Sequence, residues 1–172
     1  MSATKGFDSL PLRSELLSRL DAMGFNIMTP VQAETLPTML LGRDVIAQAN
    51  TGSGKTAAFG LACLQPLNPK AFHVQSLILC PTRELAEQVA QSLRDLAREI
   101  GNTKILTICG GKPLGPQFAS LERSAHIIVG TPGRVLKHLD KKSLNLSGLE
   151  VLVFDEADRM LDMGFIHDIR RV

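Results

Sequence analysis

One stretch of the sequence has the residue types and the spacing of a phosphate-binding loop. Residues 49 to 56 are Ala49, Asn50, Thr51, Gly52, Ser53, Gly54, Lys55 and Thr56, and a helix-compatible run follows at once. Glycines let successive backbone N–H groups point at phosphate oxygens at a helix N-terminus. We expect Lys55 to reach the β- and γ-phosphates of a nucleotide and the Thr56 hydroxyl to ligate Mg²⁺. The loop opens with Ala49 in place of the usual glycine, and the alternative interpretation is a Gly/Ser turn before a helix.

A second stretch places acidic side chains directly after an apolar run. Asp155, Glu156 and Asp158 follow the segment Val151–Phe154, with Ala157 between the last two acids. A Mg²⁺ ion on phosphates requires such a carboxylate, and we assign this role to Asp155. Glu156 is suitably placed to orient and deprotonate the water that attacks a γ-phosphate. The alternative interpretation is a charged helix N-terminus, since acids favour that end of the helix dipole.

Short β-branched runs alternate with helical periodicity along most of the chain. We expect strands, buried on both faces, at Asp44–Gln48, Ser76–Cys80, Lys104–Cys109, His126–Gly130 and Val151–Phe154. The expected helices are Leu12–Met23, Val31–Leu41, Lys55–Leu64, Glu84–Ile100 and Pro116–Arg123. This alternation predicts an α/β fold with a doubly wound, mostly parallel sheet. In such sheets ligands bind beyond the carboxyl ends of the strands, where the glycine loop and the acidic motif both fall.

Composition gives weaker evidence about function. The chain has 172 residues and a formal net charge of +2, so any nucleic-acid contact must be local rather than a bulk electrostatic effect. Cys63, Cys80 and Cys109 are far apart in apolar segments, which indicates reduced, buried thiols and no zinc site. No apolar run approaches the ~20 residues of a membrane span, and no signal-peptide core is present, so we expect a cytoplasmic protein without a membrane partner.

Several further motifs stand in the order found in one family of enzymes. Together with the glycine loop and the acidic motif, the sequence resembles the DEAD-box ATP-dependent RNA helicases over essentially its whole length. The motifs that carry the resemblance are Gly24-Phe25 followed by Thr29-Pro30-Val31-Gln32, then Pro81-Thr82-Arg83-Glu84-Leu85-Ala86, Gly110-Gly111 and Thr131-Pro132-Gly133-Arg134. The resemblance implies a RecA-like fold, ATP and Mg²⁺ as ligands, and RNA as partner.

The first of these motifs resembles the family's adenine-recognition motif. The Gln32 amide has a donor and an acceptor that suit adenine N6 and N7, which favours ATP over GTP. Phe7 stands at the family's upstream aromatic position and is expected to stack on the base, or else to anchor the N-terminus to the core.

The remaining motifs resemble the family's RNA-contacting segments. The residues concerned are Pro81, Thr82, Arg83, Gly110, Gly111, Thr131, Pro132, Gly133 and Arg134. Hydroxyls, backbone amides and guanidinium groups grip phosphate and sugar without reading bases, so binding should be independent of sequence. The alternatives are helix caps for Thr82 and Thr131 and solvated surface arginines.

The resemblance also implies a domain organisation. Residues 1–34 would be a flanking segment with the adenine motif, and residues 35–172 a first RecA-like ATP-binding domain. The family's Ser-Ala-Thr motif, to which Asp158 would couple, and a second RecA-like domain would follow Val172. Sequence around the motifs resembles the bacterial DbpA-type subfamily, which implies ribosomal RNA as target and a role in ribosome biogenesis.

The expected function is therefore that of the N-terminal ATPase domain of an RNA helicase. In the full protein, ATP hydrolysis would drive local separation of RNA duplexes, and the isolated domain would be weakly active. Two alternatives stay open: another P-loop NTPase such as a kinase or DNA translocase, and a nucleotide-binding module with little turnover. RNA compared with DNA as activator separates the helicase from the translocase.

Overall fold

The computed structural model describes residues 5–111 and 113–172, which fall into two compact units. The first unit comprises the chain up to Leu67 together with Ser92–Gly101, and the second comprises Asn68–Gln91 and Asn102–Val172. Nothing in these units tests the predicted boundary after residue 34, which stays a prediction; residues 1–4 of that flanking segment lie outside the described residues. Among the described helices, none is long and apolar enough to cross a membrane.

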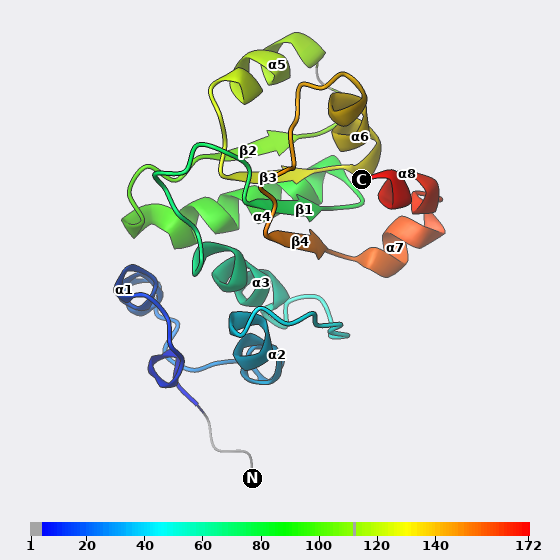
Figure 1. The fold of residues 1–172 in the computed structure, drawn as a ribbon. Helices are drawn as coiled ribbons and strands as arrows, with labels where there is room; N and C mark the ends of the chain where they lie inside the picture. Colours follow the sequence, from blue (N-terminus) through cyan, green and yellow to red (C-terminus); the bar gives the residue numbers. More distant parts are fainter. Residues whose placement is uncertain (1–4, 112) are drawn as a thin grey trace. The chain divides into compact units, whose positions relative to one another are not determined.

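The second unit is built on a parallel sheet of four short strands (Figure 1). The strands are β1 (Ser76–Leu79), β2 (Ile105–Ile108), β3 (Ile127–Gly130) and β4 (Val151–Phe154). Their order is β2-β3-β1-β4, and β1 pairs with both β3 and β4. Because every pair is parallel, the carboxyl ends of all four strands lie at one edge of the sheet. The predicted parallel α/β fold is confirmed.

Helices connect these strands or follow the last of them, and they contribute to the core. They are α4 (Arg83–Leu96), whose last residues belong to the first unit, α5 (Leu114–Glu122), α6 (Pro132–Asp140), α7 (Ala157–Asp162) and α8 (Ile166–Arg171). A buried apolar cluster joins sheet and helices: Val74, Leu77, Leu79, Ile108, Ala125, Ile128, Val135, Leu144 and Met160. The strands and helices of the second unit thus share one hydrophobic core.

The first unit is helical in its described part. It contains the 3₁₀-helices η1 (Phe7–Ser9) and η2 (Ala97–Glu99) and the helices α1 (Ser14–Ala22), α2 (Pro30–Leu40) and α3 (Lys55–Leu64). Gly60 in α3 faces the Leu93 and Leu96 side chains, and an added Cβ there would lie 3.1 and 3.0 Å from them. The close approach explains why an apolar helix carries a glycine at this position.

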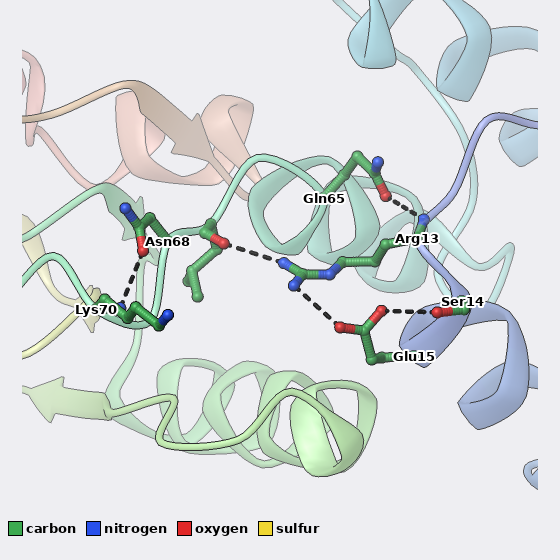
Figure 2. A network of polar contacts seen from close by, with 7 residues as sticks. Arg13, Ser14, Glu15, Gln65, Asn68 and Lys70 are labelled. Atoms are coloured by element: carbon green, nitrogen blue, oxygen red, sulfur yellow. Dashed lines mark hydrogen bonds and ion pairs between the residues drawn. The ribbon is translucent and has the colours of Figure 1, made fainter.

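A polar network fixes the start of α1 within the first unit (Figure 2). The Arg13 backbone N–H donates to Gln65 Oε1 at 2.8 Å, and its Nη1 donates to the Leu67 carbonyl at 3.0 Å. The Glu15 carboxylate accepts from Arg13 Nη2 and from Ser14 Oγ, both at 3.1 Å. Backbone hydrogen bonding, followed by that of Arg13 and Ser14, lowers the pKa of Glu15. These bonds tie the start of α1 to the end of α3, the helix that follows the glycine loop.

Four of the five predicted strands are confirmed, and one is wrong. Residues Asp44–Gln48 form no strand, and the Ile46 side chain is fully exposed. A strand needs a neighbour for its backbone groups, and all sheet pairing in the described part of the chain is among β1–β4. The β-branched character of the run therefore does not suffice to make it a strand.

The expectation that the strands are buried on both faces holds only at the centre of the sheet. Strands β1 and β3 are buried along their whole length, whereas β2 and β4 have a strand neighbour on one side only. On β4 the Leu152 and Phe154 side chains are 43% and 40% exposed. Edge position is a property of the topology, which the composition of a single strand does not reveal.

The predicted helices are all present with small shifts at their ends. The helix expected at Lys55–Leu64 has these bounds in α3. The one expected over Glu84–Ile100 is α4 followed by the 3₁₀-turn η2, with Val89, Leu93, Leu96 and Ile100 buried and Leu85 half-buried. Tightening of a last turn to 3₁₀ geometry is common at helix ends.

Candidate functional site

The glycine loop lies at the N-terminus of α3, in the first unit. Gly52 and Gly54 have φ of +80° and +93°, a left-handed conformation that side chains disfavour. Gly54 is the N-cap and Lys55 the first residue of α3, so the loop leads directly into free backbone N–H groups at a helix start. The loop and helix of the predicted motif are confirmed, whereas the strand predicted before the loop is not present.

The side chains of the loop fit a phosphate. Lys55 Nζ donates to the Ala49 carbonyl and, at 3.0 Å, to the Asn50 carbonyl, so the loop folds over its own ammonium group. Ser53 Oγ is buried and has no hydrogen-bond partner in the described structure. A buried hydroxyl without a partner is costly. A phosphate oxygen in the loop would supply both the acceptor for Ser53 and a stronger counter-charge for Lys55.

Gln32 links the predicted adenine motif to this loop. Its Oε1 accepts from the Thr29 N–H at 2.9 Å, its Nε2 donates to the Gly54 carbonyl at 3.1 Å, and the side chain is 4% exposed. Thr29 Oγ1 in turn accepts from the Gln32 N–H, which completes a capping box at the start of α2. The amide is thereby held in a fixed orientation against the loop. Its pairing with adenine stays a prediction.

A surface pocket of about 490 Å³ joins these two motifs within the first unit. Its lining comes from the start of α2, from the loop and from the residue before the loop: Thr29, Pro30, Val31, Gln48, Ala49, Asn50 and Ser53. Gln32 is not among these lining residues, so the pocket does not test its predicted role in recognising a base. Phe7 is 4% exposed within η1, as an anchoring residue would be, and its stacking role stays a prediction.

The acidic motif follows β4 in the second unit. The Asp155 N–H continues the sheet by donating to the Leu79 carbonyl at 2.9 Å, and Asp155 is 8% exposed. Glu156 then adopts φ 52° and ψ 51°, a left-handed conformation uncommon for this residue type, and caps α7. Such backbone outliers concentrate at functional sites. The metal role of Asp155 and the water-activating role of Glu156 stay predictions.

The motif also forms the charged helix start that was the alternative interpretation. Glu156 is the N-cap and Asp158 lies exposed in the first turn of α7. Arg159 Nη1 forms an ion pair with Glu156 Oε2 at 3.1 Å. Beside the motif, burial and then the Asp155 charge raise the pKa of the Cys80 thiol well above its usual range. Cys80 is thus an inert, protonated thiol, in agreement with the prediction for the cysteines.

The two predicted metal residues each have chemistry that suits Mg²⁺. The Thr56 hydroxyl in the first unit and the Asp155 carboxylate in the second are hard oxygen donors, which Mg²⁺ prefers. No group of three or more His, Cys, Asp or Glu side chains in the described residues could hold a metal. Mg²⁺ commonly keeps waters and substrate phosphates among its ligands, so it needs few protein donors, and the role of these two residues stays a prediction.

The predicted RNA-contacting motifs meet in the second unit, at the carboxyl ends of three neighbouring strands. They follow β1, β2 and β3 respectively. The Gly110 N–H donates to Thr131 Oγ1 at 3.4 Å, and an added Cβ on Gly111 would lie 3.7 Å from Arg83 Nη1. A single surface thus collects backbone amides, hydroxyls and guanidinium groups, which is the inventory for gripping phosphate and sugar.

The alternative interpretation of the threonines holds for one of them. Thr82 Oγ1 accepts from the Leu85 N–H at 3.3 Å and caps α4. Thr131 is the N-cap of α6, but it makes no side-chain capping bond. Pro132 is buried at the first position of that helix, and an added Cβ at Gly133 would lie 3.2 Å from Asp168 Oδ2.

Sequence reasoning did not find two polar partners of these motifs, Gln117 and Arg159. Arg134 Nη1 donates at 3.1 Å to Gln117 Oε1, and Glu156 is paired with Arg159. The spacing of seventeen residues between Gln117 and Arg134 matches no helical or strand period. Only the fold of α5 and α6 reveals the first of these pairs.

Comparison with known proteins agrees with this geometry. ATP-dependent RNA helicase DbpA of Escherichia coli (strain K12) is 60% identical over 149 residues, covering 87% of this chain and 33% of that protein. DEAD-box ATP-dependent RNA helicase CshA of Bacillus subtilis (strain 168) is 43% identical over 166 residues, covering 96% of this chain and 33% of that protein. The chain thus spans about a third of the length of these relatives.

Solved structures show the same fold. A DEAD box protein from the hyperthermophile Methanococcus jannaschii superposes with a TM-score of 0.91 at 41% identity, covering 96% of this chain and 45% of that one. A hypothetical ATP-dependent RNA helicase from Sulfolobus tokodaii gives a TM-score of 0.84 at 40% identity, covering 92% and 46%. The family model for DEAD/DEAH box helicases matches residues 29–172. The resemblance seen in the motifs is therefore confirmed, and the chain belongs to the DEAD/DEAH box helicase family.

Proposed function

We propose that this chain is the N-terminal ATP-binding part of an ATP-dependent RNA helicase. The observation that carries the proposal is the glycine loop at the start of α3, with Gln32 bonded to Gly54 and the Ser53 hydroxyl buried without a partner in the described structure. A loop of this kind suits an anion, and it is bonded to an amide of the type that reads adenine. The names of the relatives, ATP-dependent RNA helicases, agree with it.

Each residue has a role in this proposal. Lys55 exchanges the Ala49 and Asn50 carbonyls for the β- and γ-phosphate oxygens of ATP, and Gln32 selects adenine. Thr56 and Asp155 are each suited to serve as an oxygen ligand of Mg²⁺, which when bound would neutralise charge on the phosphates. Glu156 accepts a proton from the attacking water once its pair with Arg159 opens. Asp158, exposed on α7, is suited to couple this part to the Ser-Ala-Thr motif and a second RecA-like domain.

The RNA-contacting surface supports sequence-independent binding of one strand. Arg83 and Arg134 contribute charge, and the loops at Gly110 and Thr131 contribute amide and hydroxyl groups. A surface with few phosphate contacts should bind in the non-specific range of about 10⁻⁴ to 10⁻⁶ M. A ribosomal RNA target and a cytoplasmic location belong to this proposal as well, as expectations carried over from the sequence.

Binding of matched RNA and DNA strands tests the proposal against its alternatives. A fluorescent oligoribonucleotide and the deoxy strand of the same sequence are titrated with the chain and with Arg83→Ala, in the presence of Mg²⁺ and a non-hydrolysable ATP analogue. We expect tighter binding of RNA, since a 2′-hydroxyl distinguishes the two strands, and weaker binding by the variant. Equal binding of both strands would favour the DNA translocase, and no binding of either would leave a nucleotide-binding module.

A further inference from the structure

A buried polar network connects two of the RNA-contacting loops within the second unit. Gln117 on α5 is 8% exposed, and its Nε2 donates at 3.0 Å to the carbonyl of Cys109, the residue before Gly110. Its Oε1 accepts from Arg134 Nη1 at 3.1 Å and lies 3.0 Å from His138 Nε2. One amide on α5 therefore bridges the loop after β2 and the Arg134 guanidinium on α6. Figure 1 shows α5, β2 and α6 in the same part of the second unit.

The chemistry of the partners fixes the orientation of this amide. Reversing it would place Oε1 against the Cys109 carbonyl and the NH₂ group against the Arg134 guanidinium, so both contacts would become repulsive. Since Oε1 only accepts, His138 must donate from Nε2, which in the neutral ring leaves Nδ1 as an acceptor 2.8 Å from Ser143 Oγ, whose hydroxyl also lies 3.1 Å from the His138 carbonyl. His138 is fully buried, and the Phe118 ring packs against it edge-on at 5.0 Å. The amide is thus held from three sides before any ligand arrives.

The hydrogen bond that Arg134 donates to Gln117 Oε1 sets the direction of the Arg134 guanidinium. A guanidinium carries five N–H donors in a rigid fork, so holding one of them orients the whole planar group. Long side chains lose rotamer freedom on binding, and a side chain that is already ordered loses less. Arg134 is one of the groups that the proposed function assigns to the RNA backbone, whereas Gln117 and His138 lie beneath the surface.

We infer that Gln117, anchored by His138 and the Cys109 carbonyl, is a positioning residue that pre-orients Arg134 for an RNA phosphate. The inference rests on the proposed function, because it needs Arg134 to contact RNA. It adds that the strength of this contact is set by a residue that does not touch RNA. Loss of pre-orientation should weaken RNA binding by roughly 2- to 10-fold, the range that corresponds to releasing one long side chain.

The first test is a double-mutant cycle on RNA affinity and its salt dependence. Arg134→Ala, Gln117→Met and the double variant are titrated with a labelled single-stranded oligoribonucleotide at several salt concentrations. Arg134→Ala should reduce the slope of log K against log salt by about 0.7, the value for one phosphate contact on a single strand. Gln117→Met should weaken binding and reduce the slope in the same direction, and it should add nothing in the Arg134→Ala background.

A matched control separates positioning from general loss of stability. Gln75 is another buried amide of the same unit, and in the described structure its side chain bonds the backbone of Asn68 and Ala71, outside the RNA motifs. Gln75→Met should therefore leave RNA affinity and salt slope unchanged. If Gln117→Met weakens RNA binding equally in the presence and absence of Arg134, or if Gln75→Met does the same, the positioning role is overturned.

A measurement on the unsubstituted chain keeps the inference testable if Gln117→Met does not fold. The Arg134 side-chain N–H signals are followed by ¹⁵N relaxation without RNA. We expect an order parameter above about 0.6, the limit below which groups count as flexible. A mobile guanidinium would overturn the inference whatever the RNA data. Unchanged RNA binding by Arg134→Ala, with a rigid guanidinium, would instead refute the RNA role of Arg134 in the proposed function.

Discussion

The contact between Gly54 and Gln32 gives a prediction that two alanine variants can test. Both Gly52 and Gly54 have left-handed backbone, with φ of +80° and +93°, which costs a non-glycine residue about 1–2 kcal/mol. An added Cβ at Gly52 meets nothing within 4 Å, whereas one at Gly54 would lie 2.5 Å from Gln32 Nε2 and 3.1 Å from Thr29 Oγ1. Gly54→Ala must therefore displace the amide in addition.

The extra cost follows from the bonds that the displaced amide loses. Gln32 donates to the Gly54 carbonyl at 3.1 Å and accepts from the Thr29 N–H at 2.9 Å. Each bond contributes a net ~0.5–1.5 kcal/mol, so Gly54→Ala should lower the free energy of unfolding by about 1–3 kcal/mol more than Gly52→Ala. In a Gln32→Ala background only the 3.1 Å approach to Thr29 Oγ1 remains, so the part of the difference that comes from the amide bonds should disappear.

Urea unfolding followed by far-UV circular dichroism measures this difference, since the chain contains no tryptophan or tyrosine for fluorescence. All four combinations of the two glycine variants with and without Gln32→Ala are compared at one pH and salt concentration. Equal destabilisation by Gly52→Ala and Gly54→Ala would refute the reasoning. An undiminished difference in the Gln32→Ala background would show that its origin is not the amide.

Three further predictions concern hydrolysis, pH and packing. Lys55→Ala should abolish nucleotide binding in calorimetry, whereas Glu156→Gln should keep binding and slow phosphate release by about 10²- to 10⁴-fold; equal losses in both properties would contradict the assigned roles. Burial, and then the Arg134 charge, lower the pKa of His138, so the unfolded chain takes up this proton first as the pH falls. This titration therefore leaves the free energy of unfolding unchanged above about pH 6.5 and should lower it below that pH by at most about 1.4 kcal/mol per pH unit. Urea titrations at several pH values measure this slope, which His138→Asn should reduce. An added Cβ at Gly130 would lie 2.5 Å from the Ile108 carbonyl oxygen, so Gly130→Ala should lower the free energy of unfolding by about 1–3 kcal/mol. Gly101→Ala, with nothing within 4 Å of the added Cβ, should lower it by less than about 0.5 kcal/mol in the same unfolding assay.

Much of the fold could be predicted because local pattern and tertiary environment agree. The apolar run Val151–Phe154 and the helix Lys55–Leu64 occur with the predicted bounds. The sequence marks one boundary of each element: an acidic pair follows the last residue of the strand, and a glycine precedes the first residue of the helix. The segment Asp44–Gln48 has the same local pattern, yet it lacks a pairing partner in the described structure and is no strand.

The candidate site was predictable where its residues are close in the chain. The glycine loop and the acidic motif each lie within eight consecutive positions, and a strand end or a helix start then fixes their direction. The Gln32–Gly54 bond and the Gln117–Arg134 bond join residues on different helices. Their geometry depends on how helices pack, and periodicity within one helix contains no information about a contact to another. Such pairs become visible only in the structure.

Nucleotide binding by calorimetry tests the central claim most directly. ADP and GDP are titrated in the presence of Mg²⁺ into the chain, into Gln32→Ala, and into Thr35→Val, which loses a hydroxyl bond to the Val31 carbonyl within α2 but keeps the Gln32 amide. We expect binding of ADP in preference to GDP, a loss of that preference in Gln32→Ala, and its retention in Thr35→Val. Equal binding of both nucleotides that is unchanged in Gln32→Ala would contradict adenine recognition by this residue and reopen the wider class of P-loop NTPases.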